Sequence, residues 1–97
     1  MLTGKEKRYL RSLANSIDPI VQVGKAGVND SVLISLNEAL EARELIKVKV
    51  LKNCLDEVSE VAEGLAAGGN AHLVQTIGRN IILYRPHPSK PKIVLPK

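Results

Sequence analysis

The fold is decided by residues 20–29, which read IVQVGKAGVN. The first four residues form an apolar run of strand length, and a glycine-rich turn follows them. Asn29 is a residue type that often caps helices, so a helix should begin directly after it. The order of strand, turn and helix favours a parallel neighbouring strand that is reached by a right-handed crossover.

The chain beyond this stretch predicts a second strand and a third helix. Over residues 45–51 apolar residues alternate with Lys47 and Lys49, so this strand should have one buried face and one basic face. Asp56 is the expected N-cap of the next helix, and Gly68-Gly69 should end that helix. Helical spacing predicts apolar faces at Val32, Leu33, Leu36, Ala39 and Leu40 and at Val58, Val61, Ala62 and Leu65.

The N-terminal segment predicts an amphipathic helix over about residues 4–15. Thr3 and Glu6 have the spacing of a capping box, which would satisfy two backbone amides at the start of this helix. Its apolar residues fall on one side of the helical wheel and should face the core. The opposite side should show solvent a basic stripe of Lys5, Lys7, Arg8 and Arg11.

The C-terminal third predicts a hairpin and a tail. Residues 72–77 and 81–85 should be strands, joined by the turn Gly78-Arg79-Asn80. Residues 86–97 form a tail rich in proline and lysine, which should be extended and could add a short edge strand at 93–95.

Together these elements predict a single compact α/β domain over residues 1–97, in the order α-β-α-β-α-β-β, with a four-stranded mixed sheet. A chain of 97 residues is a usual size for one domain, and 44% hydrophobic residues are enough for an aliphatic core. We expect a cytoplasmic protein without a signal peptide or membrane span. Cys54 is the single cysteine, and nothing in the sequence demands a dimer, so we expect a monomer.

Charge is distributed unevenly along the chain. Residues 1–27 hold five basic and two acidic side chains, residues 28–63 hold four basic and eight acidic, and residues 64–97 hold five basic and none acidic. Two basic ends around an acidic middle indicate one surface that faces anions and one solvated surface. Only Tyr9 and Tyr84 are aromatic, which argues against recognition of bases on an aromatic platform.

The loop Gly24-Lys25-Ala26-Gly27 is the first candidate for phosphate binding. Glycines allow a sharp turn and a close approach of the backbone to an anion, and the N-terminus of the following helix favours negative charge. Lys25 adds a mobile charge at the tip. Glycine turns before helices are common, so the alternative is a loop that only reverses the chain. Further candidates for contacts with phosphate are Lys47, Lys49, Arg79, Arg85 and the basic stripe of the first helix.

Residues suited to catalysis are few, and we expect no metal site, cofactor or small-molecule substrate. His72 and His87 have no obvious carboxylate or cysteine partner by spacing, and Glu57, Glu60 and Glu63 fall on one outward helix face. An enzyme that modifies or cleaves RNA is an alternative, with His72 and Glu63 as its least unfavourable pair. A protein-interaction adaptor that uses Ile34 and the acidic helix faces is another.

Several motifs resemble the bacterial YhbY proteins, which are stand-alone forms of the CRM (chloroplast RNA splicing and ribosome maturation) domain. The motifs are Gly24–Val28, Ala39–Glu41, Glu44–Lys49, Val74–Arg79 and Ile82–Pro86, and they cover nearly the whole chain in order.

The resemblance implies a fold similar to the C-terminal domain of translation initiation factor three, with a glycine loop like that of KH domains. It also implies a ribosome-assembly factor that binds ribosomal RNA in precursors of the large subunit. By this resemblance the phosphate-binding role falls on Gly24, Lys25, Ala26 and Gly27. We therefore expect a non-catalytic RNA-binding protein.

Overall fold

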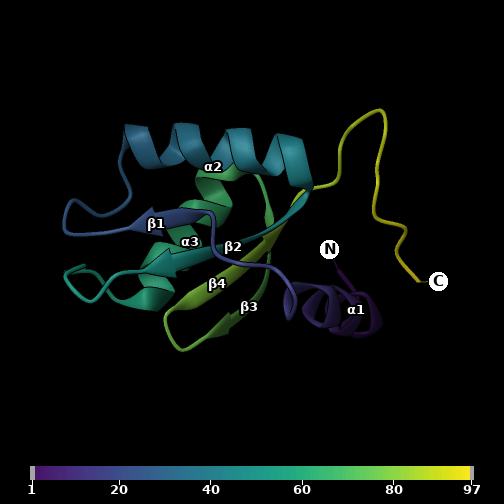
Figure 1. The fold of residues 1–97 in the computed structure, drawn as a ribbon, viewed down its shortest axis with the longest axis horizontal. Helices are drawn as coiled ribbons and strands as arrows, with labels where there is room; N and C mark the ends of the chain where they lie inside the picture. Colours follow the sequence, from purple (N-terminus) through teal and green to yellow (C-terminus); the bar gives the residue numbers. More distant parts are fainter. Residues whose placement is uncertain (1, 97) are drawn as a thin grey trace.

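A four-stranded mixed sheet organises the protein, as the computed structural model of residues 2–96 shows (Figure 1). Its strands are β1 (Val21–Val23), β2 (Leu45–Val50), β3 (His72–Ile77) and β4 (Asn80–Tyr84). The strand order is β1-β2-β4-β3, with β1 parallel to β2 and β4 antiparallel to both of its neighbours. The predicted fold class and element order are confirmed, although the hairpin turn contains only Gly78 and Arg79 because Asn80 already belongs to β4.

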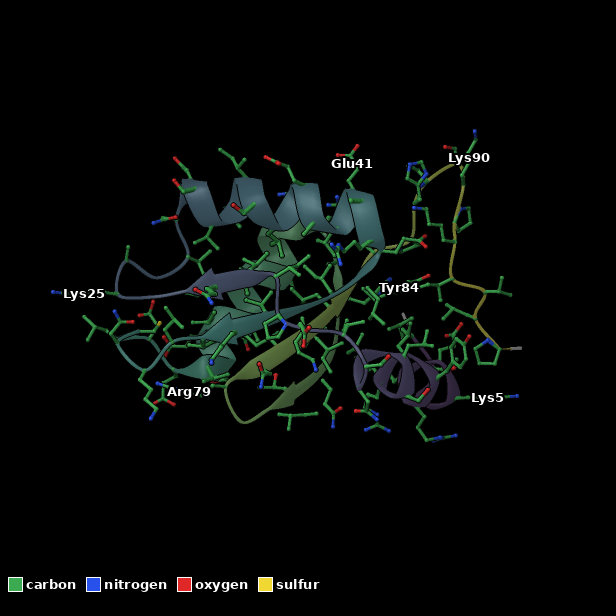
Figure 2. The ribbon with its side chains drawn as sticks, viewed as in Figure 1. Lys5, Lys25, Glu41, Arg79, Tyr84 and Lys90 are labelled. Atoms are coloured by element: carbon green, nitrogen blue, oxygen red, sulfur yellow. The ribbon has the colours of Figure 1, made fainter. Side chains whose placement is uncertain are left out.

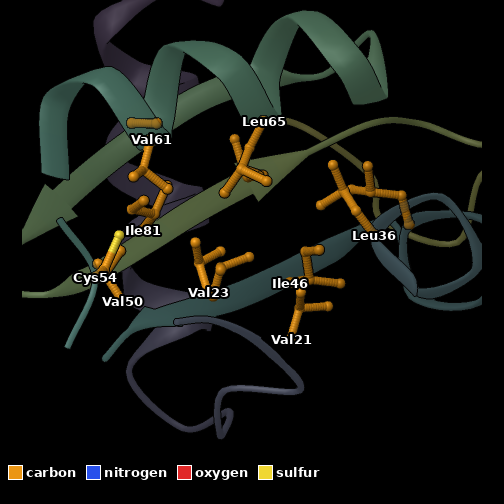
Figure 3. Close-up of a cluster of buried hydrophobic side chains, with 13 residues drawn as sticks. Val21, Val23, Leu36, Ile46, Val50, Cys54, Val61, Leu65 and Ile81 are labelled. Carbon is orange, nitrogen blue, oxygen red and sulfur yellow. The ribbon is translucent and has the colours of Figure 1, made fainter. Parts of the chain in front are cut away.

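Helices cover the two faces of the sheet unequally. The helices α2 (Asp30–Arg43) and α3 (Val58–Gly69) lie over one face, and α1 (Gly4–Ala14) packs against part of the other (Figure 1). The larger core, between the sheet and α2 and α3, is aliphatic (Figure 3). Burial of each valine or leucine contributes roughly 1.5–3 kcal/mol. The smaller core under α1 consists of Leu10, Ala14, Leu45, Val74, Ile82 and Tyr84.

The starts of the first two helices follow the sequence predictions. Thr3 Oγ1 accepts a hydrogen bond from the Glu6 amide at 3.1 Å, and the Glu6 carboxylate accepts the Thr3 amide at 2.8 Å. Asn29 caps α2, because its Oδ1 accepts the Val32 amide at 2.9 Å.

The predictions for the two ends of α3 were wrong. Glu57, not Asp56, is the N-cap, and it makes no side-chain capping bond. The helix also continues through Gly68 and Gly69 and ends at Asn70, which adopts a left-handed conformation (φ 47°, ψ 49°). A Cβ at Gly69 would lie 3.0 Å from both Leu36 Cδ2 and Leu40 Cδ1. These glycines therefore let α3 approach α2 closely instead of ending the helix.

The C-terminal tail is tied to the domain by Glu44, the residue between α2 and β2. Its carboxylate is buried and accepts three backbone hydrogen bonds, from His87 at 2.8 Å, Lys92 at 2.7 Å and Ile93 at 2.9 Å. Burial acts to raise the pKa of Glu44, but these amides and the nearby His87 lower it overall. Residues 86–96 form no strand, so the edge strand considered for the tail is not present in the described residues.

Candidate functional site

Three loops meet at one edge of the sheet. Val23 pairs with Val50 at the carboxyl ends of the parallel strands β1 and β2, and Ile77 pairs with Asn80 where β3 turns into β4. Because Lys49 pairs with Asn80, the hairpin turn lies at this same edge (Figure 1). We call the loops 24–29, 51–57 and 78–79 together the loop edge.

Backbone hydrogen bonds hold the three loops of the loop edge together. The Leu51 amide donates to Val23 O at 2.8 Å, which joins the first loop to the second. The Val50 amide donates to Arg79 O at 2.8 Å, and the Arg79 guanidinium donates to Leu51 O at 3.3 Å. The loop edge is therefore a connected surface built from segments far apart in the sequence.

The structure gives both glycines of the first loop a packing role. Gly27 has a φ of +69°, and a Cβ there would lie 2.8 Å from Asp56 Oδ2. A Cβ at Gly24 would lie 3.4 Å from Asn53 Oδ1. The glycines thus let the first loop lie against the second one. The Gly27 amide donates to Gly24 O at 3.0 Å, and this turn leaves Lys25 and Ala26 exposed at its tip.

The N-terminus of α2 is less available to an anion than the sequence suggested. The Asn29 side chain already accepts one of its amides, and Asp30 places a carboxylate in the first turn. An acidic side chain there offsets the positive end of the helix dipole. The cationic side chains around the turn are therefore the stronger attraction for phosphate.

Basic side chains from each of the three loops, and one from the end of β2, lie at the loop edge. Lys25 stands at the tip of the glycine turn, and Arg79 lies in the hairpin turn (Figure 2). Lys49 is exposed near the end of β2. Lys52 is exposed in the second loop and is an addition to the candidates predicted from the sequence. The predicted parallel pairing of β1 and β2 could have pointed to Lys52, because it places the residues that follow β2 beside the glycine loop.

The open half of the sheet connects the loop edge to α1. Alternation along β2 places Lys47 and Lys49 on the same face as Leu45, which contacts α1. Lys5 on α1 and Lys25 lie at opposite ends of the long axis of the molecule, which measures 39 Å (Figure 2). We use the name basic face for Lys47 and Lys49 together with the α1 side chains Lys5, Lys7, Arg8 and Arg11. Of these, Lys7 is half-buried and lies beside Ala71, His72 and Leu73 at the start of β3.

Arg85 lies apart from both surfaces. It follows β4 at the end far from the hairpin turn, and its guanidinium donates to Asn37 Oδ1 at 2.7 Å and Gly69 O at 2.6 Å. These bonds join α2 to the C-terminal end of α3. The structure therefore gives Arg85 a role in helix packing.

Both histidines make contacts within the fold. The His72 ring stacks on Tyr84 with a centroid separation of 6.2 Å, and Glu63 is exposed on α3. His87 Nδ1 accepts hydrogen bonds from the Ser89 and Lys90 amides.

Within residues 2–96, no three His, Cys, Asp or Glu side chains are grouped so that they could hold a metal ion. No helix in the described part of the chain is long and apolar enough to cross a membrane.

Comparison with known proteins identifies the family. The CRS1 / YhbY (CRM) domain matches residues 2–85. The chain belongs to this family. The resemblance seen in the sequence motifs is therefore confirmed, and the CRM match ends at Arg85, before the tail that Glu44 holds.

Relatives of this CRM domain are named as RNA-binding proteins. The chain is 55% identical over 96 residues to the "Probable RNA-binding protein YqeI" of Bacillus subtilis, covering 99% of this chain and 100% of the relative. It is 36% identical over 96 residues to the "RNA-binding protein" of Haemophilus influenzae, covering 99% and 96%. The solution structure of SAV1595 from Staphylococcus aureus superposes with a TM-score of 0.83 at 51% identity, covering 99% of this chain and 100% of that one.

Proposed function

We propose that this CRM protein is a non-catalytic RNA-binding protein that holds the phosphate backbone at the loop edge and along the basic face. The observation that carries the proposal is the meeting of Lys25, Lys52 and Arg79 on hydrogen-bonded loops. The names of its relatives support RNA as the ligand.

The arrangement suits recognition of shape and charge. Lysine and arginine neutralise phosphates and release counterions, which contributes binding energy without reading the sequence. The turn of the glycine loop exposes Lys25 at its tip, while the hairpin holds Arg79 beside the second loop. In this proposal the glycine loop is one anchor, and Lys47, Lys49 and α1 extend the path of the RNA.

A pair of charge reversals tests the proposal. Lys25→Glu should weaken binding of a fluorescein-labelled structured RNA at least tenfold in fluorescence anisotropy at moderate salt, because it replaces an attraction by a repulsion. Lys90→Glu is the matched control, since it changes the net charge equally at the far end of the molecule (Figure 2). It should change the affinity less than twofold. Equal losses for the two variants, or none for Lys25→Glu, would contradict a site at the loop edge.

We further propose ribosomal RNA in precursors of the large subunit as the natural ligand, a role that rests on the family resemblance. Crosslinking in cells followed by sequencing of the attached RNA should enrich segments of large-subunit ribosomal RNA. A diffuse profile over many transcripts would overturn the ribosomal assignment but not RNA binding. Turnover of a structured RNA that is lost in His72→Ala would favour the enzymatic alternative instead.

A further inference from the structure

Leu55 is an apolar side chain that the fold presents to solvent at the loop edge. It is 82% exposed, whereas the preceding residue, Cys54, is buried in the core. Single exposed leucines are common on protein surfaces, so exposure alone carries no functional meaning. Its position among phosphate-binding candidates is what makes it informative.

The loop that carries Leu55 is fixed on both sides of this residue. Cys54 is buried in the larger core, and its amide donates to Leu51 O at 3.1 Å. On the other side, the Asp56 carboxylate lies against Gly27. The Cys54 thiol also donates a weak hydrogen bond to Asp56 O at 3.9 Å, so contacts on both sides of Leu55 hold the loop in a conformation that directs this side chain outward.

The loop of Leu55 and the two loops bonded to it carry both basic and acidic side chains. Lys52 belongs to the same loop, and Lys25 and Arg79 belong to the two loops bonded to it. The carboxylates of Asp56 and Glu57 are also nearby in the sequence, but Asp56 is directed at Gly27. An exposed apolar side chain on a loop that carries Lys52, and that is bonded to the loops of Lys25 and Arg79, fits a ligand that presents both phosphate and an apolar surface.

A nucleobase supplies that apolar surface, and the loop edge has no aromatic residue to receive it. Tyr9 lies on α1, and Tyr84 ends β4 at the far side of the sheet. In a duplex the faces of the bases are stacked and inaccessible, whereas unpaired nucleotides expose them. Stacking on aromatic side chains is sequence-tolerant because every base has a π-face, and an aliphatic side chain can bury apolar surface against the same face.

Resting on the proposed function, we infer that Leu55 packs against an unpaired nucleobase while the neighbouring cations hold the adjacent phosphates. The loop edge then binds single-stranded or looped RNA in preference to a continuous duplex. Leu55 acts as a specificity-determining contact for unpaired RNA, and Lys25 acts on any RNA backbone.

The test compares a single-stranded oligonucleotide with a blunt duplex of the same sequence, using anisotropy. Leu55→Ala should weaken single-strand binding about fivefold, because less apolar surface is buried against the base, and should leave duplex binding within twofold. Val94→Ala is the matched control, because Val94 is 80% exposed on the tail and should change neither affinity. Leu55→Met should retain most of the single-strand affinity, since it keeps an apolar side chain of similar size.

Salt dependence separates this inference from the proposed function. Leu55→Ala should leave the slope of log affinity against log salt unchanged, because it displaces no counterion, whereas Lys25→Ala should reduce the slope by about 0.7–1. Unchanged single-strand binding in Leu55→Ala, or equal losses on strand and duplex, would overturn the inference alone. If Lys25→Ala also changes neither affinity nor slope, the proposed function fails with it.

Discussion

Replacement of Glu44 by glutamine should loosen the C-terminal tail. Oε1 of Glu44 accepts the amides of Lys92 and Ile93, and Oε2 accepts the amide of His87. Glutamine keeps the shape but has only one carbonyl oxygen, so its NH2 group must face at least one of these N–H donors. That arrangement removes a charge-assisted hydrogen bond and leaves a buried donor unpaired.

The expected cost follows from this geometry. Loss of a hydrogen bond to a charged group, with a buried donor left unpaired, costs about 2 kcal/mol. For a domain of this size such a loss lowers Tm by roughly 8–16 °C. Ile93 and Leu95 pack against the core under α1, so release of the tail would also expose apolar surface.

Urea unfolding followed by circular dichroism would measure the free energy of unfolding, and amide hydrogen exchange would report on residues 87, 92 and 93. Glu44→Gln should lower both the global stability and the protection of these amides. Glu41→Gln is the control, because Glu41 is an exposed carboxylate on the same helix (Figure 2). If Glu44→Gln stays within 0.5 kcal/mol of the parent and keeps the three amides protected, the proposed clamp is wrong.

Three further predictions concern the pH dependence of the Glu44 contacts and the C-terminal end of α3. The folded-state pKa of Glu44 lies below its ordinary value of 4.5, so its stabilisation is complete above that pH and should be lost as the pH falls through the folded pKa. The protection factors of the tail amides, corrected for the intrinsic exchange rate at each pH, should therefore fall in acid for the parent and stay constant for Glu44→Gln. Gly69→Ala should destabilise the domain by about 1–3 kcal/mol in urea, since its Cβ would press on buried Leu36 and Leu40, and a gain in stability would contradict the close approach of α2 and α3. Asn70→Ala should cost about 1 kcal/mol while Asn70→Gly costs nothing measurable, because residue 70 is left-handed; equal melting temperatures for the two variants would refute this explanation.

Sequence patterns predicted most of the fold because its signals are local. The alternation around Lys47 and Lys49, the cap at Asn29 and the capping box of Thr3 each involve residues within a few positions of one another. The C-terminal end of α3 was missed because Gly68 and Gly69 are required by contacts with α2, which a single segment does not reveal.

The candidate site could be predicted only in part from the sequence, because several of its contacts join residues that are far apart in the chain. The charge of Lys25 could be placed on a turn, but the hydrogen bonds of Arg85 to Asn37 and Gly69 join residues 48 and 16 positions apart. No sequence pattern distinguishes such an arginine from one that binds phosphate. Lys52 and Leu55 became candidates once the sheet topology placed the loop 51–57 against the glycine loop.

Titration of ¹⁵N-labelled protein with a short structured RNA, followed by NMR, tests the central claim most directly. If RNA binds at the loop edge, the largest amide shifts should occur at Gly24–Gly27, in the loop 51–57 and at Arg79, with smaller shifts along Lys47, Lys49 and α1. Shifts confined to the outer faces of α2 and α3, with the loop edge unaffected, would contradict it.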